Sequence, residues 1–335
     1  MFKKIIVLFL VILVVFVGLE ILASAEVIKV RFGINQDITT PQYRSSMEFA
    51  EKVKELSNGQ ILVTVYPSMQ LGDIREQAEM VQTGAIEMSK QPTSVWSNFS
   101  TTFEALDIPF LFKNSGALHD VVNGPVGAEI ANSLKDEGIV PLGFSTGGLK
   151  QMTANKPIHN PDDLKGMKFR TMPAQILIKT YESFGANPTP IGFSEMYNAL
   201  QQGVVDGQEN PLQTVDMMKL WEVQKHLSLT NNGPMLYLVG ANKKWFEALS
   251  KDLQQNIIDA FKYALEREWK DNDMAEAGWL ENAKKNGMIV YTPTEKDIQA
   301  FRDKTKGIVD FVKGRVGATI VDKLLMAAEE ANKHN

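Results

Sequence analysis

The sequence predicts an α/β protein of two lobes that share one long helix. Strand and helix patterns alternate in the N-terminal part of the chain, which is typical of a mostly parallel sheet covered by helices. The chain has 335 residues, more than a single hydrophobic core usually supports. A helical pattern over residues 252–286 is too long for one small lobe. Since no linker or repeat divides the sequence, we expect several strands to cross between the lobes.

Residues 1–25 are predicted to be a signal peptide. Lys3 and Lys4 precede an unbroken apolar run over 5–17, and Ala23-Ser24-Ala25 offers the small residues that a signal peptidase reads. The apolar run is shorter than the roughly 20 residues of a membrane-spanning helix. We therefore expect cleavage after Ala25, with an uncleaved membrane anchor as the alternative.

The first lobe is expected to follow the order β-α-β-α-β. Alternating branched and polar residues indicate its strands, and apolar residues at helical spacing indicate its helices. Asn58-Gly59 and Gly84 are typical of helix ends. The expected elements are strands at 27–34, 61–66 and 85–89 and helices at 45–56 and 72–81.

The rest of the chain mixes short strands with a series of helices. The strands are expected at 138–144, 152–156, 167–171, 204–205 and 235–241, and the helices at 118–134, 176–184, 194–202, 252–286, 303–311 and 318–331. The predicted division assigns residues 26–147 and about 236–275 to lobe I, and residues 148–235 and about 276–335 to lobe II.

The composition excludes several classes of function. The chain has no cysteine, so it has no disulfide, thiol nucleophile or thiolate metal site. A net charge of −5 without a basic run argues against nucleic-acid binding. Phosphate-binding and dinucleotide-binding glycine patterns are lacking, and we expect no cofactor. We expect no metal site either, because four scattered histidines form no ligand pair: His119, His159, His226 and His334.

One motif offers an enzymatic alternative. Residues 143–147 read G-F-S-T-G, which matches the nucleophile elbow of serine hydrolases around Ser145. That motif requires a helix directly after the serine, whereas residues 148–153 are expected to form loop and strand. The other interpretation is a flexible crossover between the lobes, where the glycines permit unusual backbone angles.

The most informative region covers residues 160–212. Arg170 ends a short expected strand just before Pro173, where a guanidinium is suited to bind a carboxylate through two parallel hydrogen bonds. Polar residues 206–210 follow the two-residue strand expected at 204–205. Ligands of α/β sheets bind at the carboxyl ends of strands, so Asn210 could donate to and accept from a ligand there. A surface arginine and an ordinary solvated turn are the alternatives.

The same region resembles the DctP-type solute-binding proteins of tripartite ATP-independent periplasmic (TRAP) transporters. The resemblance rests on a D-L-K-G turn, K-F-R, G-A-N-P and the long run F-S-E-M-Y-N-A-L-Q-Q-G-V-V-D-G-Q-E-N-P within residues 163–211. It extends to Y-P-S-M-Q-L-G-D at 66–73, L-D-I-P-F-L-F at 106–112 and Y-L-V at 237–239, and so covers essentially the whole mature chain.

The resemblance implies a periplasmic binding protein-like fold whose lobes close over one organic acid by hinge bending. It implies that Arg170 clamps the carboxylate, that Asn210 bonds the ligand and that Phe193 packs on it. Lys150 occupies the position of a second basic residue, which is arginine in sialic-acid members of the family. Glu209, beside Asn210, is a further candidate ligand contact.

Lobe I contacts are implied for the loops after the first and third strands. These loops supply Asn35 with Gln36, and Gln91 with Thr93. The implied partners are a small organic acid anion and the small and large membrane subunits of the transporter, with the protein a monomer in the periplasm and not an enzyme. A binding module for a sensor or chemoreceptor is the alternative that the sequence leaves open.

Overall fold

The computed structural model describes residues 27–335, so the predicted signal peptide and its cleavage site lie outside the described residues. The strands are β1 Ile28–Ile34, β2 Ile61–Tyr66, β3 Met88–Pro92, β4 Ile139–Ala154, β5 Lys168–Thr171, β6 Asn187–Pro190, β7 Gly207–Pro211, β8 His226–Ser228, β9 Pro234–Asn242 and β10 Ile289–Tyr291.

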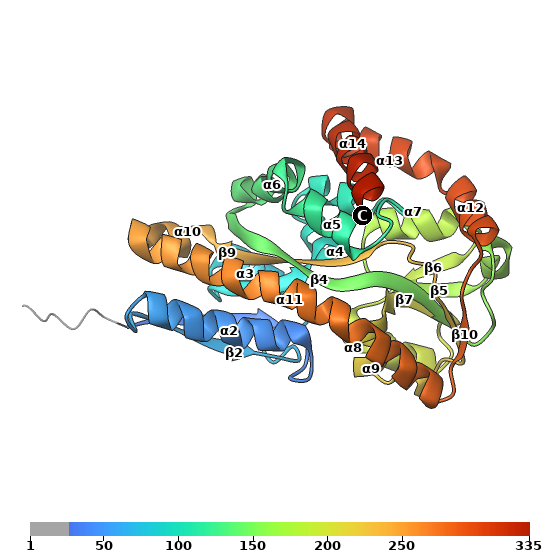
Figure 1. The fold of residues 1–335 in the computed structure, drawn as a ribbon, viewed down its shortest axis with the longest axis horizontal. Coiled ribbons are helices and arrows are strands. Elements are labelled where there is room, and N and C mark those ends of the chain that lie inside the picture. The colour runs from blue at the N-terminus through green and yellow to red at the C-terminus, as the bar shows by residue number, and fades with distance from the viewer. Residues whose placement is uncertain (1–26) are drawn as a thin grey trace, which may run out of the picture.

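Helices cover the strands on both sides (Figure 1). They are α2 Pro41–Leu56, α3 Ile74–Thr83, α4 Thr93–Trp96, α5 Ser115–Val122, α6 Pro125–Asn132, α7 Gln175–Ser183, α8 Phe193–Gln201, α9 Leu212–Met217, α10 Lys243–Ala248, α11 Lys251–Lys285, α12 Glu295–Lys304, α13 Lys306–Val316 and α14 Ala318–His334. Short 3-10 turns are η1 Thr101–Asp107, η2 Ser133–Glu137, η3 Pro161–Leu164 and η4 Leu220–Glu222.

The strands form one continuous path in the order β2-β1-β3-β9-β4-β7-β5-β6. In lobe I, β1 runs parallel to β2 and β3, and β9 is antiparallel to β3. In lobe II, β5 runs parallel to β6 and β7. Strand β4 belongs to both: residues 139–149 pair with β9, and residues 150–154 pair with β7 and β8. The predicted fold of two α/β lobes joined through a crossing strand is thus confirmed.

The two ends of α3 are set by residues close to them in the sequence. Asp73 caps α3 and forms a reciprocal capping box with Glu76, which satisfies backbone donors at the helix start. Gly84 ends the helix in the left-handed conformation, with φ of +81°, where a side chain would be strained.

Helix α11 crosses both lobes, as predicted. Its 35 residues span about 52 Å at 1.5 Å per residue. Figure 1 shows it running from beside α10 in lobe I to the α8–α9 side of lobe II. In lobe I its Phe261 stacks on Phe49 of α2 at 3.5 Å between ring centroids, and both rings meet Phe32 of β1 edge to face. Near its middle, Trp269 Nε1 donates to the carbonyl of Phe144 on β4, 3.3 Å away.

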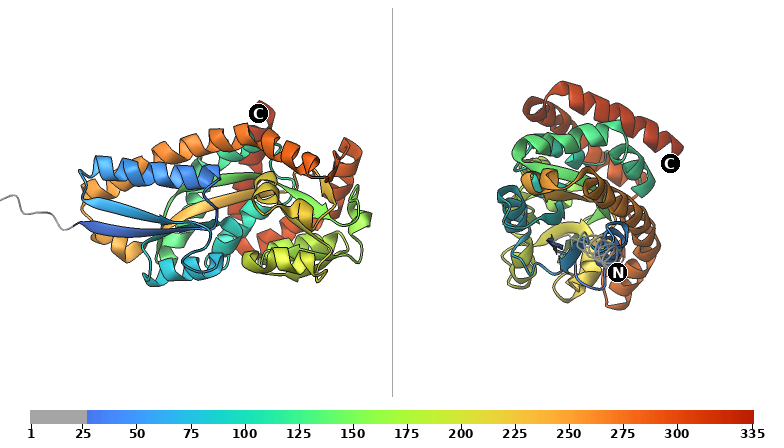
Figure 2. Two further views of the ribbon diagram at one scale, coloured as in Figure 1. Left: turned by 90° about the horizontal axis from the view of Figure 1, so that it is seen from below. Right: turned by 90° about the vertical axis from the view of Figure 1, so that its left-hand side faces the viewer.

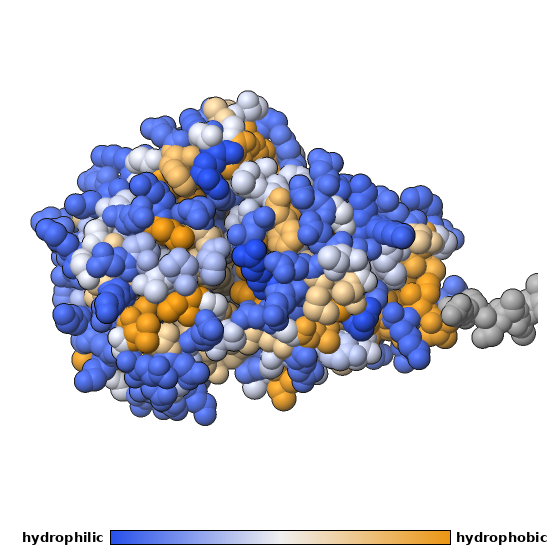
Figure 3. All heavy atoms as spheres, turned by 180° about the vertical axis from the view of Figure 1, so that it is seen from behind, coloured by the Kyte–Doolittle hydropathy of each residue, from blue (hydrophilic) through white to orange (hydrophobic). Residues whose placement is uncertain are grey.

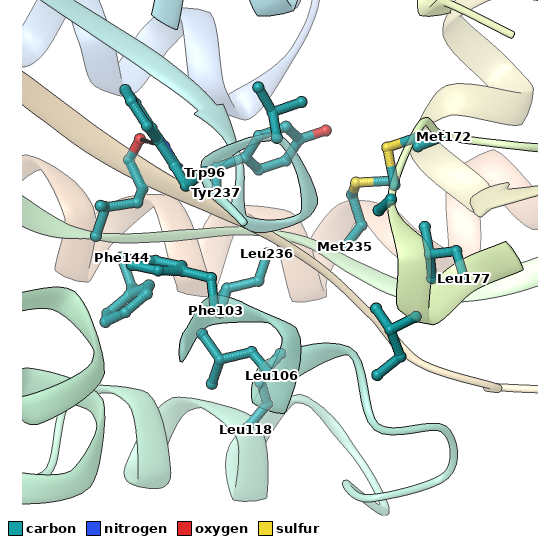
Figure 4. Close-up of a cluster of buried hydrophobic side chains, with 14 of the residues drawn as sticks. Trp96, Phe103, Leu106, Leu118, Phe144, Met172, Leu177, Met235, Leu236 and Tyr237 are labelled. Atoms are coloured by element: carbon teal, nitrogen blue, oxygen red, sulfur yellow. Dashed lines mark hydrogen bonds between the residues drawn. The ribbon is translucent and has the colours of Figure 1, made fainter. Parts of the chain in front are cut away.

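A second layer lies on the other side of the crossing strands. There Trp96, Phe103, Leu106, Phe144 and Leu236 form a cluster of buried side chains around β4 and β9 (Figure 4). Helix α14 packs against α5 and α6 over this cluster, and the two views of Figure 2 show the C-terminal helices on that side of the molecule. This contact joins segments that the predicted division assigned to different lobes, so the exact division stays a prediction.

Several predicted elements were wrong, among them the single helix expected at 303–311, which is divided between α12 and α13 at Thr305. The helix expected at 118–134 is two helices, because Pro125 cannot continue α5 and instead begins α6. The loop and strand expected over 148–153 belong to the single strand β4. The strand expected at 204–205 lies at 207–211, so the polar residues read as a solvated turn form the buried strand β7.

None of the helices in the described part of the chain is long and apolar enough to cross a membrane. The face seen in Figure 3 is mainly hydrophilic, and its apolar areas are small and separated.

Candidate functional site

Strand pairing in lobe II brings distant candidate residues together. Strand β7 lies between β4 and β5. Its Asn210 is opposite Gln151, next to Lys150, and its Gln208 is opposite Arg170. Arg170, Asn210, Lys150 and Glu209 are each at most 2 % exposed. These are polar residues that a sheet interior does not normally hold.

Arg170 is a buried cation without a counter-ion. Its Nε donates to the carbonyl of Ile191 at 3.0 Å, and its Nη2 has no hydrogen-bond partner. It forms no salt bridge with any described residue. Burial lowers the pKa of Arg170 to about 10, although the charges of Glu209 and Asp73 oppose this shift. The side chain remains charged at neutral pH and has hydrogen-bonding capacity to offer an anion.

Lys150, in contrast, is already paired. Its Nζ lies 3.0 Å from Glu209 Oε1 and 3.5 Å from Asp107 Oδ1, with all three side chains buried. Burial disfavours the ammonium, but Glu209 and Asp107 outweigh burial and hold the pKa of Lys150 above its usual value. Glu209 also accepts from Tyr181 at 2.9 Å and from Asn232 at 2.5 Å. Lys150 and Glu209 therefore form the centre of a buried network of ion pairs and hydrogen bonds.

The carboxyl group of Asp107 responds to the same surroundings. Burial raises its pKa to about 6, with Lys150 opposing the shift and Glu209 adding to it. Two carboxylates share one ammonium here, so the second is held less tightly in its charged form. One oxygen of Asp107, Oδ2, has no partner.

Asn210 and Phe193, two further candidates from lobe II, are both buried. Asn210 Nδ2 donates to Gln208 Oε1 at 2.5 Å and lies 3.3 Å from the sulfur of Met196. Phe193 is the first residue of α8 and is 6 % exposed.

The lobe I candidates are neutral and incompletely bonded. Asn35 Oδ1, both amide atoms of Gln36 and Gln91 Oε1 are buried without a partner. Thr93 Oγ1 donates to the carbonyl of Leu236 at 3.2 Å. Burial raises the pKa of Tyr237 to about 12, and the opposing effect of Gln36 and Asn35 indicates that they face its hydroxyl.

Two contacts place Arg170 near the boundary between the lobes. Asp73, the cap of α3 in lobe I, accepts from Ser194 at the start of α8 in lobe II, and its charge acts on Arg170. On the other side, Ser94 Oγ of α4 lies 3.7 Å from the sulfur of Met172, which follows β5. Figure 4 shows Met172 close to Met235 at the side of the buried cluster away from Phe144.

Ser145 lacks the geometry of a nucleophile elbow. It lies inside the continuous strand β4, is fully buried, and donates to Glu268 of α11. No helix follows it, because the strand runs on to Ala154. The hydrolase alternative therefore loses its structural basis.

Sequence reasoning missed a second buried ion pair. Lys90 of β3 lies 2.6 Å from Glu268 of α11, and both side chains are essentially inaccessible. Burial lowers the pKa of Lys90, with Glu268 opposing the shift. A lysine within a strand of lobe I was the available sign of this pair. Its partner could not be inferred, because Glu268 is 178 residues away in the sequence. Among residues 27–335, no cluster of three histidine or acidic side chains could hold a metal ion.

Comparison with known proteins gives a consistent result. A family model described as bacterial extracellular solute-binding protein, family 7 (DctP) matches residues 32–314. The C4-dicarboxylate-binding periplasmic protein DctP of Rhodobacter capsulatus is 32% identical over 319 residues, covering 93% of this chain and 95% of the relative.

Solved structures agree with this family. The sugar acid binding protein DctPAm from Advenella mimigardefordensis, in complex with galactonate, superimposes with a TM-score of 0.88 at 30% identity, over 91% of this chain and 99% of that one. A TRAP periplasmic solute-binding protein from Desulfovibrio salexigens, with bound orotic acid, has a TM-score of 0.86 at 32% identity, again over 91% and 99%.

Proposed function

The chain belongs to family 7 of the bacterial extracellular solute-binding proteins, the DctP-type proteins of TRAP transporters, and from this premise we propose that it captures one small organic acid anion between its lobes. The family consists of binding proteins for transport and not of enzymes. In our proposal the guanidinium of Arg170 holds the carboxylate, and hinge closure completes the site.

The observation that carries the proposal is the unpaired charge of Arg170. Burying a cation without a counter-ion is costly, and proteins rarely retain one without a function. An entering carboxylate would accept from Nη2 and share the guanidinium fork, and the resulting charge-assisted hydrogen bonds would offset the dehydration of both groups. Burial lowers the pKa of Arg170, and a bound carboxylate would oppose that shift.

Asn210 and Phe193 complete the proposed lobe II surface. The amide of Asn210 would bond a second ligand oxygen, and the ring of Phe193 would pack against the ligand carbon atoms. Lys150 and Glu209 remain candidate contacts. Each already has a buried partner, so the proposal gives recognition of the ligand charge to Arg170.

The lobe I amides are proposed to select among acids. Asn35, Gln36 and Gln91 offer unpartnered donors and acceptors, and Thr93 offers a hydroxyl. The compared proteins bind a C4-dicarboxylate, galactonate and orotic acid, which share a carboxylate and differ in the rest of the molecule. Neutral amides are suited to read that remainder, because they bind hydroxyl, carbonyl and imino groups alike.

A thermal-shift screen tests the binding proposal. Succinate, galactonate and orotate would be compared with neutral sugars of similar size, since a ligand that binds only the folded state raises the melting temperature. We expect at least one acid to raise it and Arg170→Ala to abolish the rise. Arg267→Ala is the matched control, because the side chain of Arg267 is about half exposed on the surface of α11. Equal shifts for Arg170→Ala and wild type would contradict the proposal.

We further propose that the closed protein works in the periplasm as a monomer and presents the acid to the small and large membrane subunits of a TRAP transporter. Uptake of the identified acid by vesicles that contain both subunits should require the added protein. Uptake at the same rate without it would contradict delivery.

A further inference from the structure

Three buried amide side chains from different parts of the fold meet at one point. Gln42 comes from α2 of lobe I, Gln213 from α9 of lobe II, and Asn272 from the middle of α11. They are 0 %, 3 % and 0 % exposed. Gln213 donates to the side-chain oxygen of Gln42, whose Nε2 donates to Asn272 Oδ1 at 3.1 Å. We call these three residues the amide cluster.

The amide cluster sits where β4 changes lobes. Gln42 Nε2 also donates to the carbonyl of Thr146, the last residue before a register shift between β4 and β9. Gly148, just after that shift, has φ of +94°, and Asn272 Nδ2 lies 3.5 Å from the position of an added Cβ there. A strand with a bulge and a left-handed glycine bends more easily than a regular one.

The contact between Gln42 and Gln213 depends on the relative position of the lobes. The other side-chain bonds of Gln42 go to β4 and α11, which both lobes share. Gln213 is held by a helix that follows β7 of lobe II. A rotation of lobe II about the bulge would therefore separate these two side chains while leaving the rest of the cluster in place.

We propose that the hydrogen bond from Gln213 to Gln42 is a closing contact that sets the ratio of closed to open protein without touching the ligand. The inference rests on the proposed hinge closure. A neutral amide pair is suited to this role because it can exchange its bond for water on opening at little cost, whereas a buried ion pair could not. Any ligand that binds the closed form then has an apparent affinity scaled by this ratio.

Spin-label distances in the ligand-free protein test the proposal directly. The chain has no cysteine, so Glu79→Cys and Asn198→Cys place two labels at exposed sites on α3 and α8 without other labelling. Asp73 caps the start of α3 and Ser194 lies in the first turn of α8, and these two residues are in contact across the lobe boundary. We expect two distances between the labels, a short one for the closed protein and a long one for the open protein.

Gln213→Met should raise the open-to-closed ratio by about two- to tenfold, the worth of one net hydrogen bond. Gln213→Asn, which keeps an amide but cannot reach Gln42, should do the same if the methionine variant folds poorly. Gln224→Met is the control, since Gln224 is an equally buried amide bonded to Thr153 within lobe II. It should leave the ratio unchanged.

The outcomes separate this inference from the proposed function. If two distances are seen and the ratio of their populations is the same in wild type, Gln213→Met and Gln213→Asn, the closing contact is overturned and hinge closure still stands. One distance in wild type that no organic acid alters would overturn hinge closure and the closing contact together. A changed ratio in both Gln213 variants, but not in the Gln224 control, supports the inference.

Discussion

The two lobes present opposite chemistry at their shared boundary. Lobe II supplies buried charge, with Arg170 unpaired and Lys150 held between two carboxylates. Lobe I supplies mainly neutral amides and hydroxyls; its buried Lys90 is neutralised by Glu268, and its buried Asp107 faces Lys150 of lobe II. The difference suggests a division of work, in which lobe II recognises that a ligand is an acid and lobe I recognises which acid.

Within lobe II, the two buried cations differ in whether they have a counter-ion. Arg170 and Lys150 are equally buried, yet only the lysine has counter-ions. A paired buried charge contributes to the folded network, whereas we propose that Arg170 binds a ligand. Removal of Arg170 should therefore change the affinity for the ligand, and removal of Lys150 should change the free energy of unfolding.

Arg170→Ala should have the largest effect, and only on binding. Loss of the cation leaves a buried ligand carboxylate unpaired, which costs on the order of 3–5 kcal/mol, or about two to three and a half decades in Kd. Titration calorimetry with the acid that gives the largest thermal shift measures this. The unfolding free energy of the ligand-free protein should stay level or rise, because an uncompensated charge is removed. A Kd within about threefold of wild type would contradict the clamp.

Lys150→Met should affect stability instead. It leaves Glu209 and Asp107 buried without their ammonium, and we expect a loss of about 3 kcal/mol in the free energy of unfolding. Urea unfolding of the ligand-free protein measures the loss. Lys179→Met is the control, because its pair with Glu182 is exposed and should contribute less than about 1 kcal/mol. Equal unfolding midpoints for Lys150→Met and wild type would show that the network is not structural.

Asp107→Asn should change how stability depends on pH. The folded state raises the pKa of Asp107 from 3.8 to about 6, so between these values the folded protein binds more protons than the unfolded chain. Wild type should therefore lose stability relative to the variant as pH rises from about 4 to about 6, by up to about 3 kcal/mol.

Urea unfolding of both proteins at a series of pH values checks this sign. Asp303→Asn is a control of opposite sign, because the exposed Asp303 has a lowered pKa, due first to a hydrogen bond from Lys306. A difference between Asp107→Asn and wild type that does not vary with pH would refute the assignment.

Gln91→Ala should have the smallest effect and the most selective one. Removal of one neutral hydrogen-bonding group should weaken binding by about 1 kcal/mol for an acid that uses it and leave other acids unaffected. Dissociation constants for two acids of the same charge would show this as a changed ratio. Gln299→Ala, at an exposed amide of α12, should change neither constant. If Gln91→Ala weakened both acids equally, lobe I would not be the selective surface.

Sequence alone predicted those parts of the fold that local chemistry decides. The helix expected at 72–81 is α3, which Asp73 caps and the left-handed Gly84 ends, and both signals lie within a few residues of the helix ends. Strand β7 was displaced in the prediction because its residues are polar. Their burial results from strands on both sides, which no local pattern records.

The pairing of charges among the candidate site residues was not predictable from the sequence. Arg170 was predicted from its place at the end of an expected strand, and Lys150 from the resemblance to the family. Their different states depend on Glu209 and Asp107, which lie 59 and 43 residues from Lys150 in the sequence. The pairing of charges over such separations is a property of the tertiary fold.

The order of the strands has a consequence for how the protein is made. Strand β3 of lobe I pairs with β9, residues 234–242, and α2 packs against α11, residues 251–285. The N-terminal lobe therefore cannot complete its sheet or core until about three quarters of the polypeptide has left the ribosome. Lobe I therefore depends for its folding on segments that are synthesised late, and its apolar strands stay exposed during most of the synthesis of the chain.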